Sequence, residues 1–240
     1  MRFPAWPKWP VKQTIGFLVV AFSITFQTTF SMAGLDLAKP WQDSQYPRVR
    51  TYLTHTGSGQ NYAADFYFAS RNHSDLYLNG EIPLADGLAG IPILTAMNGN
   101  AYILLYDLTG EGGGNFPLID AERVINGLDP IPQQSFSFVD AAQNTRNIDV
   151  EFVADSLSYR IIYVHLQIDD QYFNLPGVEE GVRQGITDLY NNAGPTCGGT
   201  YQRVAVNLQT QVTRGTLIGT SNNWGIAADE HLHLQVFKDS

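Results

Sequence analysis

The chain has 240 residues, 44% of them hydrophobic, and a formal net charge of −9 at pH 7. This acidic balance argues against nucleic acid and against an anionic membrane surface as partners. The single cysteine, Cys197, excludes an internal disulfide bond, so the hydrophobic core must stabilise the fold. About 200 residues can build such a core within one domain.

Residues 1–33 have the layout of a secretory signal peptide. Three basic residues precede an uncharged run from Thr14 to Phe30, and Ser31-Met32-Ala33 forms a small-x-small cleavage site. A membrane anchor is the alternative, although the apolar part IGFLVVAFSITF is short for a span of about 20 residues. We expect export to a periplasm, the cell surface or the medium, with residues 34–240 forming one domain that has no membrane contact. Cleavage removes three of the 14 Lys and Arg and none of the 23 Asp and Glu, so the net charge becomes −12.

The mature chain is rich in strand signals. Short runs of apolar, β-branched and aromatic residues are bounded by Gly, Asn, Asp or Pro, a pattern typical of an antiparallel all-β domain. We therefore expect a mainly β fold with at most one or two short helices. The predicted strands are Tyr62–Phe68, Ile93–Ala96, Ala101–Tyr106, Ile148–Val153, Tyr159–Leu166, Arg203–Val206, Leu217–Gly219 and His231–Phe237.

One segment favours a helix. Apolar residues recur on one helical face over residues 177–192, although Gly181 and Gly185 lower the helix propensity there. Residues 110–145 are rich in turn formers, and we expect them to be a long excursion between strands rather than a second domain.

The last predicted strand, HLHLQVF, alternates between two kinds of residue. Successive side chains of a strand point to opposite faces, so His231, His233 and Gln235 share one face while leucine and valine share the other. The two imidazoles would lie about 6–7 Å apart along the strand. Such a pair can present ligands, or a ligand and a base, to a metal ion, the alternative being two exposed polar residues. A hydrolytic zinc site needs about three protein ligands, so further donors must come from elsewhere.

Four segments between Asn61 and Phe237 carry motifs that belong together. In chain order they are NYAADF, GIPILTAMNGNAYI, RIIYVHLQ and QVTRGTLIGTSNNWGIAADEHLHLQVF. They resemble the H-x-x-x-D segment, the G-x-P-V-x-A-x-x-x-G-x-V hairpin, the Y-x-H-L strand, and the V-x-x-G-x-x-I-G turn with its H-L-H strand of the lysostaphin-type (LytM-like) zinc endopeptidases. The resemblance implies an antiparallel β-sandwich of the LytM (duplicated hybrid motif) type with long inserted loops.

Carried over residue by residue, the resemblance implies that Asp65 and His233 bind one zinc ion. It also implies that His231 and His165 lie beside the water that attacks the substrate. A histidine with an ordinary pKa near 6.5 can take a proton at physiological pH, which suits that place. Without the resemblance, Asp65 could be a turn or cap residue and His165 an ordinary strand histidine.

The chain departs from the family at the third zinc ligand. The family has histidine four residues before the aspartate, where this chain has Asn61. An amide oxygen is a poorer partner for zinc than an imidazole nitrogen. His55, in the glycine-rich THTGSGQN, is the candidate substitute, whereas His73 and Glu230 are expected to be solvent-exposed. Gln235 is a further departure, since an acidic residue is common there in the family.

Two functions therefore compete. The first is an exported zinc metalloendopeptidase that hydrolyses peptide bonds, with the peptide cross-links of peptidoglycan as the substrate the resemblance implies. The second is a catalytically inactive LytM-like domain that binds the cell wall or regulates its hydrolases, and the asparagine at the third ligand position favours it. A β-sandwich binding protein unrelated to this family is opposed by four motifs in the family's order.

Overall fold

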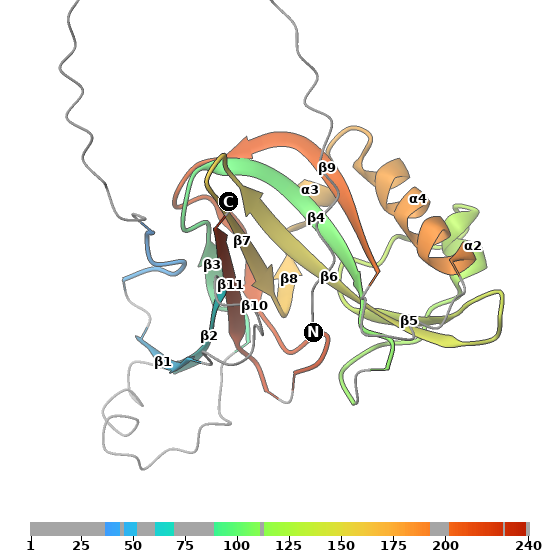
Figure 1. The fold of residues 1–240 in the computed structure, drawn as a ribbon, viewed down its shortest axis with the longest axis horizontal. Coiled ribbons are helices and arrows are strands. Elements are labelled where there is room, and N and C mark those ends of the chain that lie inside the picture. The colour runs from blue at the N-terminus through green and yellow to red at the C-terminus, as the bar shows by residue number, and fades with distance from the viewer. Residues whose placement is uncertain are drawn as a thin grey trace, which may run out of the picture.

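The computed structural model describes residues 37–43, 46–51, 61–69, 89–110, 113–192, 202–227 and 229–238. Within these ranges the protein is mainly β, as the sequence predicts, with antiparallel sheets and few helices (Figure 1). The expected signal peptide, His55, His73 and Cys197 lie outside the described residues. No helix of the described ranges is both long enough and apolar enough to span a membrane.

Two sheets organise the chain. The larger has the order β1-β2-β11-β7-β6-β4-β9, with β5 paired to β6, and the smaller has the order β3-β10-β8. The strands of the larger sheet are β1 (Tyr46–Thr51), β2 (Asn61–Ala69), β4 (Gly99–Asp107), β5 (Phe136–Val139), β6 (Thr145–Asp155), β7 (Tyr159–Val164), β9 (Arg203–Val212) and β11 (Leu232–Lys238). Those of the smaller are β3 (Pro92–Leu94), β8 (Leu166–Ile168) and β10 (Leu217–Ser221). The paired strands of both sheets run antiparallel.

Each predicted strand corresponds to a strand of the structure, with one informative difference. The segment predicted as one strand, Tyr159–Leu166, is divided between β7 of the larger sheet and β8 of the smaller. The division falls at His165, whose backbone is left-handed with φ of 63°. The strands β1 and β5 were not predicted.

The predicted helix is present, but the described residues contain more helices than the one or two that we expected. Helix α4 (Val178–Asn191) matches the predicted segment, but the described residues also contain α2 (Ala121–Ile125) and α3 (Asp170–Phe173). Helix α2 and strand β5 lie inside the turn-rich excursion 110–145. Their buried side chains belong to the same core cluster as the strands, so this excursion is a packed part of the fold.

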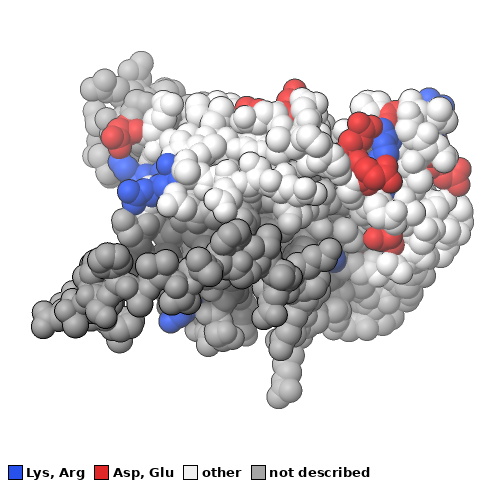
Figure 2. Space-filling model, turned by 90° about the horizontal axis from the view of Figure 1, so that it is seen from above, with Lys and Arg blue, Asp and Glu red and all other residues white. Residues whose placement is uncertain are grey.

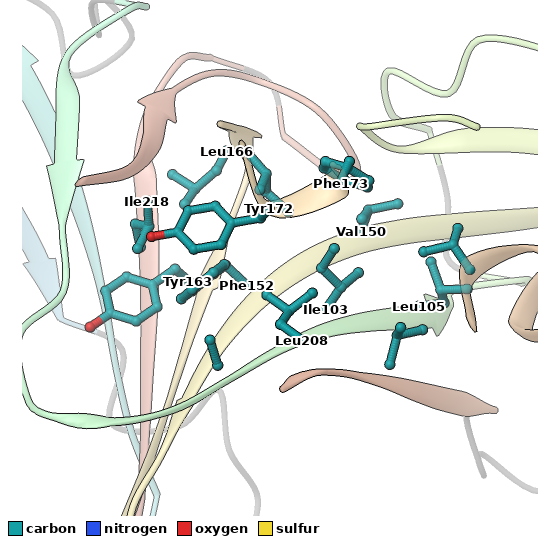
Figure 3. Packing of buried hydrophobic residues seen from close by; sticks show 14 of the residues in the cluster. Ile103, Leu105, Val150, Phe152, Tyr163, Leu166, Tyr172, Phe173, Leu208 and Ile218 are labelled. Atoms are coloured by element: carbon teal, nitrogen blue, oxygen red, sulfur yellow. The ribbon is translucent and has the colours of Figure 1, made fainter. Parts of the chain in front are cut away.

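The main core fills the space on one face of the larger sheet. The smaller sheet and the helices contribute side chains to this core. Figure 3 shows side chains of β8, β10 and α3 packed beside those of β4, β6 and β9. Two buried tyrosines from this core satisfy their hydroxyl groups by reaching neighbouring elements. The hydroxyl of Tyr163 accepts a bond from the N–H of Ala96 at 2.7 Å, and that of Tyr172 donates to the carbonyl of Leu217 at 2.8 Å. These bonds tie β7 to the segment that follows β3, and α3 to β10, the central strand of the smaller sheet.

The opposite face of the larger sheet is different in character. It carries a smaller apolar cluster of Leu104, Val153, Ile162 and Val164. Side chains alternate along each strand, so the polar residues between the core positions of β2, β6 and β11 point to this same face. We call it the site face.

One buried arginine, at the start of β6, forms hydrogen bonds with four other segments of the chain. Arg146 of β6 donates to Asp107 from Nε at 2.8 Å and to Asp140 from Nη1 at 3.3 Å. The same guanidinium donates to the carbonyl of Asn192, at the end of α4, and to Gln202, which precedes β9. A buried cation with this many partners fixes the geometry of the elements around it, because leaving it unpaired would be strongly destabilising.

The charged atoms seen from above are scattered over the surface. Figure 2 shows acidic and basic atoms toward the left and right ends, and further acidic atoms at the upper edge between them. The acidic balance of the sequence is thus not collected into one patch on this face.

The two glycines of α4 have a packing role. A Cβ on Gly181 would lie 2.7 Å from Val206 Cγ1, and one on Gly185 would lie 2.7 Å from Leu105 Cδ1 and 3.0 Å from Val204 Cγ1. Glycine therefore lets the helix backbone approach β4 and β9 closely. The two glycines lower the helix propensity of this segment, but the close contact with β4 and β9 leaves no room for a Cβ at either position.

The substitution Gly185→Ala separates the effect of helix propensity from the effect of packing on stability. Helix propensity alone predicts a gain of about 1 kcal/mol in the free energy of unfolding, whereas overpacking predicts a loss of about 1–3 kcal/mol. We expect the loss, measured by urea unfolding. The exposed neighbour Gln184→Ala is the control and should change stability by less than about 0.5 kcal/mol. A more stable Gly185→Ala protein would contradict this account of the packing.

Candidate functional site

Strand pairing brings four of the predicted site residues together on the site face. Antiparallel β2 and β11 place Asp65 directly opposite His233. On the other side of β11, His233 pairs with Val164, the last residue of β7, and His165 follows it. His231 lies two residues before His233, on the same face. Asp65, His165, His231 and His233 therefore form one buried or half-buried cluster, defined here as the histidine cluster.

His233 has a protein partner on each ring nitrogen. Its Nδ1 lies 2.5 Å from Asp65 Oδ1, and its Nε2 lies 2.9 Å from Gln235 Nε2. A carboxylate only accepts and an amide nitrogen only donates, so Nδ1 carries the proton and Nε2 accepts from Gln235. Burial raises the pKa of Asp65, but the bond from His233 and the nearby imidazoles outweigh burial and leave that pKa below its ordinary value.

His231 is oriented by three neighbours. Its ring stacks on Tyr67, with 4.8 Å between centroids and an angle of 17°, and its Nδ1 lies 2.8 Å from the carbonyl of Asp229. The carbonyl accepts, so Nδ1 holds the proton and the lone pair of Nε2 faces Asp65 Oδ1 at 3.7 Å. Burial lowers the pKa of His231, which favours the neutral ring.

His165 occupies the junction between the two sheets. A left-handed backbone is uncommon for a residue with a side chain and costs on the order of 1 kcal/mol. This conformation turns the chain from β7 to β8 and places the ring 4.6 Å from that of His231 and 6.0 Å from that of His233. Its Nδ1 lies 2.6 Å from the carbonyl of Trp224 and therefore holds the proton. Burial lowers the pKa of His165 to about 3.

Asn61 lies apart from this cluster along the strand. Its backbone pairs with Phe237, four residues from the level of Asp65 and His233. Four strand residues span about 13 Å, so the backbone of this predicted third ligand is not level with the histidine cluster. Glu230 lies in the turn before β11.

The donors in place fit part of a zinc site. Asp65 and His233 supply one oxygen and one nitrogen in contact. The 3.7 Å between Asp65 Oδ1 and His231 Nε2 is close to the ~3.3 Å that separates two ligands of a tetrahedral zinc ion. In the described ranges, however, no group of three or more His, Cys, Asp or Glu side chains has the arrangement of a metal site. Two side chains able to bind zinc are thus in contact, while a third is not in place among the described residues.

Two acidic residues that the sequence interpretation missed lie on the same face of β6. Asp149 accepts a hydrogen bond from the hydroxyl of Ser135, and burial raises its pKa to about 6. Burial and the neighbouring Asp149 raise the pKa of Glu151 well above its ordinary value. The signal was available in IDVEF, where acidic residues alternate with apolar ones in a predicted strand.

Comparisons with protein-family models, curated proteins and solved structures found no match to this chain.

The buried neutral state of His165 predicts an acid-sensitive fold. Below pH about 6.5 the unfolded chain binds a proton on this residue, whereas the folded protein does so only near pH 3. Its contribution to stability is complete above pH 6.5 and is lost as the pH falls. Without metal, we expect it to lower the free energy of unfolding by about 2 kcal/mol between pH 7.5 and 5.

The measurement is urea unfolding in the presence of a chelator at several pH values. His165→Gln should lose stability less steeply toward pH 5 than the parent protein. Asp149→Asn should lose it more steeply, because an acid with a raised pKa favours the folded state as the pH falls and offsets the histidine. Equal slopes in the parent and in His165→Gln would show that this histidine is already charged or exposed.

Proposed function

We propose that the protein is an exported zinc metalloendopeptidase that cleaves peptide bonds, with peptidoglycan cross-links as the substrate. The observation that carries the proposal is the direct pairing of Asp65 with His233, with two more histidines beside them. These are the four residues for which the resemblance to the lysostaphin-type family implies roles. Export and a LytM-type sandwich belong to the same proposal.

Asp65 and His233 would hold the zinc ion, and a third donor is required. Zinc, when bound, lowers the pKa of water toward neutrality and polarises a carbonyl group. His231 Nε2 has its lone pair directed at the same carboxylate and is the described donor best placed to complete the set. His55, outside the described residues, stays the alternative.

Binding zinc through Nδ1 of His233 requires a proton shift on that ring. The proton now shared with Asp65 must leave Nδ1, and Nε2 then carries the N–H group. Gln235 can follow this change, because rotation of its amide presents an oxygen that accepts from Nε2. Gln235 would thus hold the ring of His233 in either of its two neutral tautomers.

The neutral histidines can move protons during the reaction. His231 is the proposed general base when it is not a ligand, since burial keeps its ring uncharged at neutral pH. His165 holds its proton on Nδ1, so its Nε2 is an acceptor. It can stabilise an oxyanion only after that nitrogen has taken a proton.

A second function is favoured by two observations. The backbone of Asn61 lies about 13 Å along the strand from Asp65, and Oδ1 of Asp65 already accepts a hydrogen bond from His233. Both are compatible with a domain that keeps the fold without the metal and binds cell-wall peptides or their hydrolases.

Zinc content after exhaustive dialysis, together with release of peptides from peptidoglycan, tests the proposal. We expect about one zinc per chain and turnover in the parent protein, and loss of both in Asp65→Ala and His233→Ala. Asp170→Ala removes an exposed carboxylate in α3 and should behave as the parent. A folded parent without zinc and without turnover would favour the binding domain.

The substitution Asn61→His tests whether a histidine four residues before Asp65, as in the family, can reach the zinc in this strand. The register predicts no gain in zinc affinity, because the new imidazole would start four residues from the cluster. Calorimetric titration with zinc measures the affinity. An increase of tenfold or more, about 1.4 kcal/mol, would mean that β2 bends at this site and that the family's ligand set can be restored.

A further inference from the structure

The orientation of His165 depends on a loop rather than on a side chain. Residues 222–227 form the first part of the connection from β10 to β11, and the carbonyl of Trp224 in this loop accepts the hydrogen bond from Nδ1 of His165. Whatever holds the loop therefore decides which nitrogen of His165 carries the proton. A fixed tautomer matters for proton transfer, because only the other nitrogen can accept.

Asn115 holds this loop through three of its carbonyls. Its side-chain Nδ2 donates to the carbonyls of Asn223 at 2.8 Å and Ala227 at 3.3 Å. Its backbone N–H donates to the carbonyl of Gly225 at 2.9 Å. The bound carbonyls belong to alternate residues of the loop. The carbonyl of Trp224, which lies between two of them in sequence, is the one that bonds to His165.

The loop is also confined from both sides. A Cβ on Gly114 would lie 2.4 Å from the carbonyl oxygen of Gly225, so the segment of Asn115 approaches the loop backbone closely. Gly225 has φ of 78°, and a Cβ there would lie 2.8 Å from Asp149 Oδ1 on β6. The loop backbone thus fits between the segment 113–116 and the sheet, with little space to move toward either.

We propose that Asn115 is a positioning residue that fixes the tautomer of His165 through loop 222–227. The inference rests on the proposed function, in which His165 takes part in proton transfer. Asn115 comes from the excursion between β4 and β6, fifty residues from His165 in sequence, so this segment acquires a role in the site. Nε2 of His165, left without a proton, is the atom that Asn115 keeps available to the reaction.

The test is the protonation of His165 in long-range 1H–15N spectra of the metal-free protein. The parent should show a single tautomer with the proton on Nδ1. Asn115→Asp keeps the size of the side chain and the backbone bond but removes both amide donors, so we expect a mixture of the two tautomers. Asn207→Asp is the matched control: it adds the same charge at an exposed position on β9, and the parent tautomer should persist.

Asn115→Ser provides a second variant if Asn115→Asp does not fold, since its short side chain also loses the amide donors without adding charge. The proposal is overturned if His165 keeps one tautomer in the folded Asn115 variants, or if Asn207→Asp changes it equally. The spectra need neither zinc nor turnover, so they test the role of Asn115 even if the protein proves to have no peptidase activity. Where turnover is measurable, kcat should fall about tenfold in Asn115→Asp with KM unchanged.

Discussion

The pairing of β2 with β11 is the constraint on which the site depends. It places Asp65 opposite His233 and, by strand alternation, turns Leu232 and Leu234 into the core on the other face. A slip of one residue would bury the histidines in that core and expose the leucines, so burial of the apolar face enforces the register. The stability of the fold and the geometry of the candidate site are thus set by the same hydrogen-bonded ladder.

The third histidine reaches the cluster by a different device. β7 belongs to the larger sheet and β8 to the smaller, and the single residue between them must turn the chain. That residue is His165, which is left-handed although glycine would take this conformation without cost. Left-handed residues with a side chain often lie at functional sites, so this conformation is consistent with the proposed role of the imidazole, whose direction the bond to Trp224 fixes.

Local periodicity in the sequence predicted the strands and their faces. It could not predict the path of the backbone or the contacts between residues that are far apart in the sequence. Alternation in HLHLQVF identified β11 and the face that carries the histidines. It could not show that Asn61 lies four residues along a regular strand from Asp65, because a motif spacing does not say whether the chain between is straight or bent. Gly185 lowered the helix prediction for a reason visible only in the contact with Leu105. The role of Asn115 depends on a loop more than a hundred residues away in sequence, for which the chain has no local signal.

The hydrogen bond between Asp65 and His233 both supports a zinc site and competes with it. It orients the two donors, yet an incoming ion must replace the proton that they share. A charge-assisted hydrogen bond contributes about 1.5–3 kcal/mol, whereas a complete structural zinc site binds its ion with about 10–16 kcal/mol. A complete ligand set would therefore displace the proton easily. With only Asp65 and His233 as donors the zinc affinity would be lower, so the third donor decides whether this cluster is a metal centre or a hydrogen-bonded pair.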